Sequence, residues 1–216
     1  KPLEIIAHRG ASGVAPENTL AAIQQAIDFG ADSVEIDVRL SRDNEVYLMH
    51  DSKVNRTTSG SGHIRHLNSE IIQKLDAGLW YDIKFQGEKV PTLSQVLNLC
   101  KGKVKLLIEV KSAERKRYPL LCQKISDLID EFGAYDWVTV QSFDTKVLHM
   151  FNWVNPKLNI SKLVVYNVGL TPLKIYFDEK LRRGNLLDVD YLSNVTVPVT
   201  TFLSSVFILP NSMVYT

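Results

Sequence analysis

The chain has 216 residues, of which 45% are hydrophobic, and its formal net charge is +1. This length fits one large domain or two small ones, and it is sufficient for a sizeable core. The near-neutral charge gives no reason to expect nucleic acid or an anionic membrane as a partner. No run of about 18 apolar residues predicts a membrane span.

The cysteines and the start of the chain bear on the cellular compartment. Cys100 and Cys122 lie in apolar segments, and we interpret them as buried thiols, not as a disulfide or a metal pair. No signal-peptide pattern precedes the first expected strand, so we expect a cytoplasmic location. Since the first residue is Lys1, a secreted or periplasmic location stays open if an N-terminal segment has been removed. The oligomeric state is left open.

The first 50 residues alternate apolar runs with one helical pattern. Residues 3–7 and 33–40 are predicted to be strands, and residues 18–29 an amphipathic helix that Gly30 stops. Residues 45–49 are a second short strand. The turn sequence SRDNE predicts that this strand pairs with residues 33–40 as a hairpin.

Residues 52–90, called the insertion below, have a different composition. They are polar, rich in Ser, Thr, Gly and Asn, and carry Trp80 and Tyr81. We expect one short helix, at residues 69–75. Loops of this length inside compact domains are usually functional or mobile, so we predict a functional role for the insertion.

Regular patterns return after the insertion. Helices are predicted at residues 93–100, 118–132, 145–153 and 176–183, and strands at residues 104–110, 137–141, 159–165 and 187–192. Residues 197–210 fit no single pattern, and residues 213–216 are expected to open another strand. Repeated strand–helix units with apolar strands predict a parallel sheet covered by helices, either open or closed into a barrel.

Polar side chains stand at the ends of successive apolar strands. They are His8 and Arg9, Glu35 and Asp37, His50 and Asp51, Glu109 and Lys111, and Gln141 and Ser142. In parallel α/β folds, functional residues collect at the carboxyl ends of the strands. Core packing does not require this recurrence, so we predict a functional site at that edge.

The carboxylates of this set suggest a metal site. Glu35 and Asp37 are two positions apart, so on a strand they point to the same side. Two such carboxylates repel unless one holds a proton or a cation joins them. Glu109 from another strand would complete an oxygen-only site, suited to Mg²⁺ or Ca²⁺ more than to zinc. The alternative is surface salt bridges, which the apolar flanks of Glu35 and Asp37 disfavour.

The basic residues of this set suggest acid–base chemistry on an anion. His8 and His50 could give and take a proton in one reaction, although each could also be a hydrogen-bonded structural histidine. Arg9 suits a forked grip on phosphate, and Lys111 supplies a point charge. Beside a divalent ion they indicate an anionic substrate, but both could also neutralise the carboxylates.

The order of these residues resembles that of the glycerophosphodiester phosphodiesterase family. The matching pieces are HRG (8–10), PENT (16–19), EIDV (35–38), HD (50–51), PTL (91–93), EVK (109–111) and QSF (141–143). HRG or EIDV alone would be weak evidence, whereas the ordered set is specific. The match fades after Phe143, because late motifs that read like WTVN and TD are missing.

The resemblance implies a TIM (β/α)8-type barrel formed by residues 1–216 as one domain. Only six regular barrel strands are found, and a seventh would start at residues 213–216, so we expect the barrel to be incomplete at the C-terminus. The resemblance implies that the insertion covers the substrate. Trp80 could pack against its alcohol part, with core packing as the alternative, and Gln141 is expected to bind substrate.

The resemblance also implies one Mg²⁺ or Ca²⁺ ion on Glu35, Asp37 and Glu109, with His8 and His50 as acid and base. Arg9 and Lys111 would lie near the phosphate. The expected reaction is hydrolysis of a glycerophosphodiester to glycerol 3-phosphate and an alcohol. A lysophospholipase D-like enzyme on lipid diesters and a catalytically inactive phosphodiester-binding domain are the alternatives. The metal, the alcohol and the division of roles between the histidines stay open.

Overall fold

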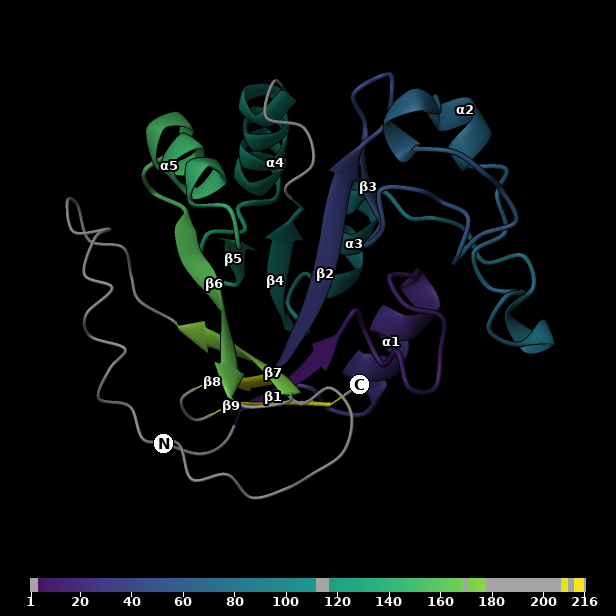
Figure 1. Ribbon diagram of the computed structural model, residues 1–216, viewed down its shortest axis with the longest axis horizontal. Helices are drawn as coiled ribbons and strands as arrows, with labels where there is room; N and C mark the ends of the chain where they lie inside the picture. Colours follow the sequence, from purple (N-terminus) through teal and green to yellow (C-terminus); the bar gives the residue numbers. More distant parts are fainter. Residues whose placement is uncertain (1–3, 112–116, 169–170, 178–206, 210–211, 216) are drawn as a thin grey trace.

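A computed structural model describes residues 4–111, 117–168, 171–177, 207–209 and 212–215 (Figure 1). The strands are β1 (Glu4–His8), β2 (Ser33–Leu40), β3 (Val46–Leu48), β4 (Lys105–Val110), β5 (Val138–Ser142), β6 (Asn159–Val168), β7 (Thr171–Phe177), β8 (Phe207–Leu209) and β9 (Ser212–Tyr215). The helices are α1 (Leu20–Asp28), α2 (Ser69–Ile72), α3 (Leu93–Cys100), α4 (Tyr118–Phe132) and α5 (Thr145–Val154). Two 3₁₀ turns, η1 (Ile64–His66) and η2 (Ile83–Phe85), lie in the insertion. Among these residues no helix has the length and apolarity that crossing a membrane requires.

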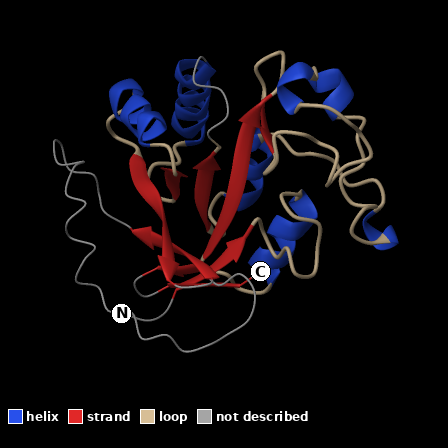
Figure 2. Cartoon of the chain, in the orientation of Figure 1, coloured by secondary structure: helices blue, strands red, loops and turns tan. Residues whose placement is uncertain are grey.

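Five strands form a parallel half-barrel. β1 pairs with β2, β2 with β4, β4 with β5, and β5 with β6, all in parallel. The helices α1, α3, α4 and α5 pack side by side in that order and cover the outer face of these strands (Figures 1 and 2). The predicted parallel sheet with covering helices is therefore confirmed.

The strand β2 shows how the two faces of the sheet are used. Val34, Ile36 and Val38 are fully buried in the main apolar core, which lies between the strands and the helices. Because side chains alternate along a strand, Glu35 and Asp37 point to the opposite side, the lumen of the half-barrel. Both are buried there as well.

Local signals fix the helix ends close to the predicted positions. In α3, Thr92 and Gln95 form a capping box, and α4 ends at Gly133, which has a left-handed backbone. The helix α1 begins two residues later than predicted, because Asn18 has a φ of 57° and the Thr19 side chain accepts the first-turn bond from Ala22 N. Cys100 and Cys122 are buried free thiols, as expected.

The hairpin of β2 and β3 is confirmed, and the insertion follows it. The two strands pair antiparallel, with Val38 opposite Leu48. The predicted helix of the insertion is shorter than expected and ends at Ile72. The insertion also has a small apolar core that the sequence did not predict. This core contains Tyr47, Met49, Val54, Ile64, Ile72, Ala77 and Val90.

Among the described residues, β6 is followed by antiparallel pairing and not by a further strand–helix unit. β7 pairs antiparallel with β6, and β8 pairs antiparallel with β9. The prediction of a helix at residues 176–183 is therefore wrong at Tyr176 and Phe177, which hydrogen bonding to β6 holds in a strand. Residues 178–183 and the predicted strand 187–192 lie outside the described residues. The strand expected from residue 213 onward is confirmed as β9, which pairs in parallel with β1.

Candidate active site

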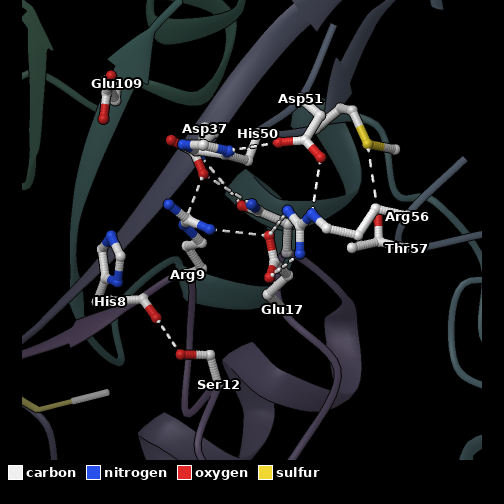
Figure 3. A network of polar contacts seen from close by, with 12 residues as sticks. His8, Arg9, Ser12, Glu17, Asp37, His50, Asp51, Arg56, Thr57 and Glu109 are labelled. Carbon is white, nitrogen blue, oxygen red and sulfur yellow. Dashed lines mark hydrogen bonds and ion pairs between the residues drawn. The ribbon is translucent and has the colours of Figure 1, made fainter. Parts of the chain in front are cut away.

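Strand register brings the predicted polar residues together at the carboxyl ends of the strands. His8 lies opposite Glu35 across β1 and β2, and Asp37 lies opposite Glu109 across β2 and β4. Gln141 is the next in line, opposite Glu109 on β5. The site is therefore built from neighbouring positions in the sheet (Figure 3).

Three carboxylates form its centre. Glu35, Asp37 and Glu109, called the carboxylate cluster below, are buried, and one oxygen of each lies within 4.8 Å of the others. Glu35 Oε1 has no hydrogen-bond partner although it is buried, which is costly unless a ligand meets it. An all-oxygen donor set fits Mg²⁺ or Ca²⁺. The surface salt bridges considered as the alternative are excluded by this burial.

The cluster divides its charge unequally. Burial and the neighbouring charges of Asp37 and Glu109 raise the pKa of Glu35 well above its ordinary value. Burial would raise the pKa of Asp37 too, but Lys111 and Arg9 outweigh it and lower that pKa to about 2. Glu35 therefore binds a proton more readily than Asp37, and a divalent ion would relieve the repulsion between these carboxylates.

Two cations contact the cluster from different sides. Lys111 Nζ lies 2.9 Å from Asp37 Oδ1 and 2.5 Å from Glu109 Oε1. Arg9 Nε lies 3.3 Å from Asp37 Oδ2. Burial would lower the pKa of Lys111, but the charges of Asp37 and Glu109 raise it, so the ammonium group stays protonated. Both cations neutralise carboxylates, and both are placed to meet an anion bound there.

The backbone after β1 explains the sequence HRG. Arg9 has a φ of 59° and Gly10 a φ of 79°, so the chain turns sharply at the strand end. This turn lets Arg9 N donate to Glu35 Oε2 at 3.1 Å. A Cβ atom on Gly10 would lie 2.7 Å from Ala22 in α1, so only glycine fits where the loop crosses the helix.

The two histidines approach the cluster from separate strands. His8, at the end of β1, is buried, and its Nε2 lies 3.8 Å from Glu35 Oε2. His50 follows β3 and is near enough to Asp37 for the charge of that carboxylate to act on its pKa. Its Nδ1 lies 2.7 Å from Asp51 Oδ1. The structure therefore places both imidazoles beside the carboxylate cluster.

His50 is held from its backbone as well as from its ring. The Arg39 guanidinium donates twice to the His50 carbonyl oxygen, at 3.1 and 2.7 Å. Burial lowers the pKa of His50 and outweighs the opposing charge of Asp37. The imidazole is therefore neutral near pH 7.

Asn18 belongs to the site, a role that the sequence patterns did not predict. Asn18 Nδ2 donates to Asp37 Oδ2 at 2.8 Å, and Asp37 N donates to Asn18 Oδ1 at 3.1 Å. Its left-handed backbone aims the amide at the cluster, and Asn tolerates that conformation better than most residues. The signal in the sequence is the PENT motif (16–19), which contains Asn18.

A second charged group lies on the loops around His50. Arg56 donates to both oxygens of Glu17 at 2.8 Å and to Asp51 Oδ2 at 2.7 Å. We call Glu17, Asp51 and Arg56 the Arg56 network. The hydrogen bond from Arg56 lowers the pKa of Asp51 to about 2. Nothing in the polar sequence of the insertion distinguished Arg56 from its neighbours.

The two remaining predicted residues, Gln141 and Trp80, lie in different surroundings. Gln141 is buried beside Glu109, and its Nε2 has no hydrogen-bond partner, so it could donate to a ligand. Trp80 is 40% exposed. Its indole donates to Ala77 O at 2.9 Å and its ring packs edge-on against Tyr81, both inside the insertion. None of these described contacts brings Trp80 to the cluster.

Comparison with known sequences identifies a related family. The sequence profile of the Glycerophosphoryl diester phosphodiesterase family matches residues 8–175. A glycerophosphodiester phosphodiesterase of Caldanaerobacter subterraneus is 40% identical over 167 residues, which cover 77% of this chain and 68% of that protein.

Two solved structures resemble the fold. A glycerophosphodiester phosphodiesterase from Agrobacterium tumefaciens is 35% identical with a TM-score of 0.67, over 73% of this chain and 65% of that one. A phosphodiesterase from Oleispira antarctica, in complex with the product sn-glycerol-3-phosphate, is 32% identical with a TM-score of 0.69. The match covers 74% of this chain and 64% of that one. The chain thus spans about two thirds of the length of these relatives.

Proposed function

The chain belongs to the glycerophosphodiester phosphodiesterase family, and we propose that it hydrolyses glycerophosphodiesters to glycerol 3-phosphate and an alcohol. The observation that carries this proposal is the buried carboxylate cluster with the imidazoles of His8 and His50 near it. The product bound by the Oleispira relative supports the substrate class.

The carboxylate cluster would hold one Mg²⁺ or Ca²⁺ ion, and the unpartnered oxygen of Glu35 supports this assignment. When bound, such an ion polarises a phosphoryl oxygen and stabilises the charge that develops on it. Arg9 and Lys111 would orient the phosphate from the two sides on which they contact Asp37. The buried amide of Gln141 would offer one further donor.

The surroundings of His50 suit a general base. Asp51 stays ionised at neutral pH and can only accept, so His50 Nδ1 carries the hydrogen of their 2.7 Å bond. The Nε2 lone pair is then available to take a proton from the nucleophile, either water or the glycerol 2-hydroxyl of the substrate. In the second case the product is a cyclic phosphate, which water must then open to give glycerol 3-phosphate. His8 would give a proton to the leaving alcohol.

Removal of metal tests this proposal. We expect the protein to release glycerol 3-phosphate from glycerophosphocholine, to lose this activity in EDTA, and to regain it with Mg²⁺ or Ca²⁺. An enzyme-coupled assay for glycerol 3-phosphate measures the release. A folded protein that binds the diester but releases nothing with either ion would instead be a phosphodiester-binding domain.

One observation favours a second substrate class. The insertion exposes Leu79, Trp80 and Ile83, and such side chains could meet the acyl chain of a lipid diester. A lysophospholipase D-like activity is therefore the second candidate. Release of choline from micellar lysophosphatidylcholine, compared with release from soluble glycerophosphocholine, separates the two.

A further inference from the structure

Arg56 is the point where the insertion is tied to two other segments of the site. Its two terminal nitrogens donate one hydrogen bond to each carboxylate oxygen of Glu17, which lies in the loop between β1 and α1. Its Nε donates to Asp51 Oδ2, at the end of the β2–β3 hairpin. The planar guanidinium of Arg56 therefore links Glu17, which is 39 positions away in the sequence, to Asp51, which is five positions away.

The two oxygens of Asp51 have separate partners. Oδ2 accepts from Arg56, and Oδ1 accepts from His50 Nδ1 at 2.7 Å. A carboxylate held at one oxygen can no longer rotate freely, so the other oxygen stays aimed at the imidazole. Glu17 fixes Arg56 in turn, and its Oε1 accepts from Arg9 Nη1 at 3.0 Å. Figure 3 shows this series of contacts from Glu17 through Arg56 and Asp51 to His50.

We infer that Arg56 is a positioning residue, which sets the orientation and the tautomer of His50 through Asp51. This inference rests on the proposed hydrolase function, because His50 is the base of that reaction. Orienting partners behind a reacting or metal-binding histidine commonly change activity by about 10- to 100-fold when they are lost.

A purely structural role for Arg56 fits the structure less well. The Arg56 side chain is 45% exposed, and ion pairs at exposed sites contribute little to stability. The insertion is held by an apolar core that it shares with Tyr47 and Met49, and Arg56 does not belong to this core. The geometry of the fork is also specific, since a lysine ammonium could not reproduce three bonds in one plane.

Kinetics of Arg56→Ala and Arg56→Lys test the inference, with Arg42→Ala as the matched control. Arg42 is an exposed arginine in the β2–β3 turn, and its variant should keep wild-type kinetics. For Arg56→Ala we expect kcat to fall by about 10- to 100-fold, with KM changed by less than the fall in kcat. The Tm should shift by no more than about 4 °C. Millimolar guanidinium should restore part of the lost rate, and potassium chloride of equal ionic strength should not.

Arg56→Lys keeps the charge and serves as the variant that folds if the alanine variant does not. It should retain less than half of wild-type kcat, because one ammonium group cannot hold Asp51 and Glu17 together. A wild-type kcat in either variant would overturn the inference. A loss of rate that guanidinium does not reverse would also overturn it.

A spectroscopic readout separates this inference from the proposed function. In ¹⁵N-histidine spectra, assigned with His50→Asn, the wild type should show the Nδ1–H tautomer of His50. Arg56→Ala should show a mixture of tautomers. If the wild type releases no glycerol 3-phosphate, the proposed function fails while this comparison still tests Arg56. Identical His50 signals in the two proteins would refute the positioning role.

Discussion

The carboxylate cluster and the Arg56 network are both sets of three charged side chains, but the fold holds them differently. Glu35, Asp37 and Glu109 stand on β2 and β4, where strand register sets which side chains face each other. The members of the Arg56 network stand on loops, and the ion pairs among them hold them together. The first set is buried, whereas the Arg56 side chain is nearly half exposed.

This difference separates two ways of building one site. The backbone of a buried strand keeps its place when one side chain is changed, so the loss is chemical. A loop that depends on ion pairs loses geometry when one partner is removed. The predictions below test that distinction, beginning with the residues nearest the proposed reaction.

The largest effects are expected at the two histidines, one at a strand end and one beside the loops. His8→Ala and His50→Ala should each lower kcat by about 10²- to 10⁴-fold, because each removes a group proposed to transfer a proton. Glycerol 3-phosphate release measures kcat, and circular dichroism shows that the fold is retained. A double variant that is still active would rule out acid–base catalysis by these residues.

A smaller effect is expected at Asn18, a loop residue that supports a strand residue. Asn18→Gly keeps the left-handed backbone but removes both hydrogen bonds to Asp37. The affinity for Mg²⁺ or Ca²⁺ should fall by about 10- to 100-fold, measured by calorimetric titration. Asn18→Ala should lower the free energy of unfolding by a further ~1 kcal/mol, because alanine is strained at this φ.

Asn44→Gly is the matched control for this prediction. Asn44 also has a left-handed backbone, with a φ of 68°. Its side-chain oxygen accepts a hydrogen bond from Arg117, which is not a member of the carboxylate cluster. Its variant should bind the ion as the wild type does. Equal losses of affinity in the two glycine variants would show that backbone freedom, and not the Asn18 amide, is responsible.

The smallest effect is expected from the pH dependence of the Arg56 network. The folded pKa of Asp51, about 2, lies below its ordinary value, so the ionised form stabilises the fold above the ordinary pKa. This stabilisation is lost as the pH falls toward 2. Since both side chains are partly exposed, it should amount to less than about 1 kcal/mol.

Urea unfolding of the wild type and Asp51→Asn at about pH 5 and about pH 2 measures it. At the higher pH the free energy of unfolding should be larger for the wild type than for Asp51→Asn. At the lower pH the two proteins should have similar free energies of unfolding. A gap that widens as the pH falls would contradict the assignment of Asp51 as an ionised partner of Arg56.

The strand-borne half of the site could be predicted from the sequence, and particular residues show why. Glu35 and Asp37 alternate with Val34, Ile36 and Val38, and that period fixes which side chains share a face. Parallel pairing of β1 and β4 with β2 then brings His8 and Glu109 beside them. The position of each residue therefore follows from where its strand ends.

The loop-borne half could not be predicted in the same way. Arg56 meets Glu17 across 39 positions, and no local pattern connects them. Tyr176 and Phe177 show a similar limit, since their helical pattern gives way to pairing with β6. In both cases a distant partner decides the geometry.

The position of β3, outside the parallel strands, has a consequence for how this fold can diversify. β3 ends the order of strands and pairs with β2 alone among the strands described, so it takes no part in the stagger of the parallel strands. Segments of different length and chemistry can therefore be grafted between His50 and Thr92 while the scaffold keeps its shear. Under the proposed function, exchanging this one module would change the surface offered to the leaving alcohol, provided that the graft retains an arginine able to reach Asp51.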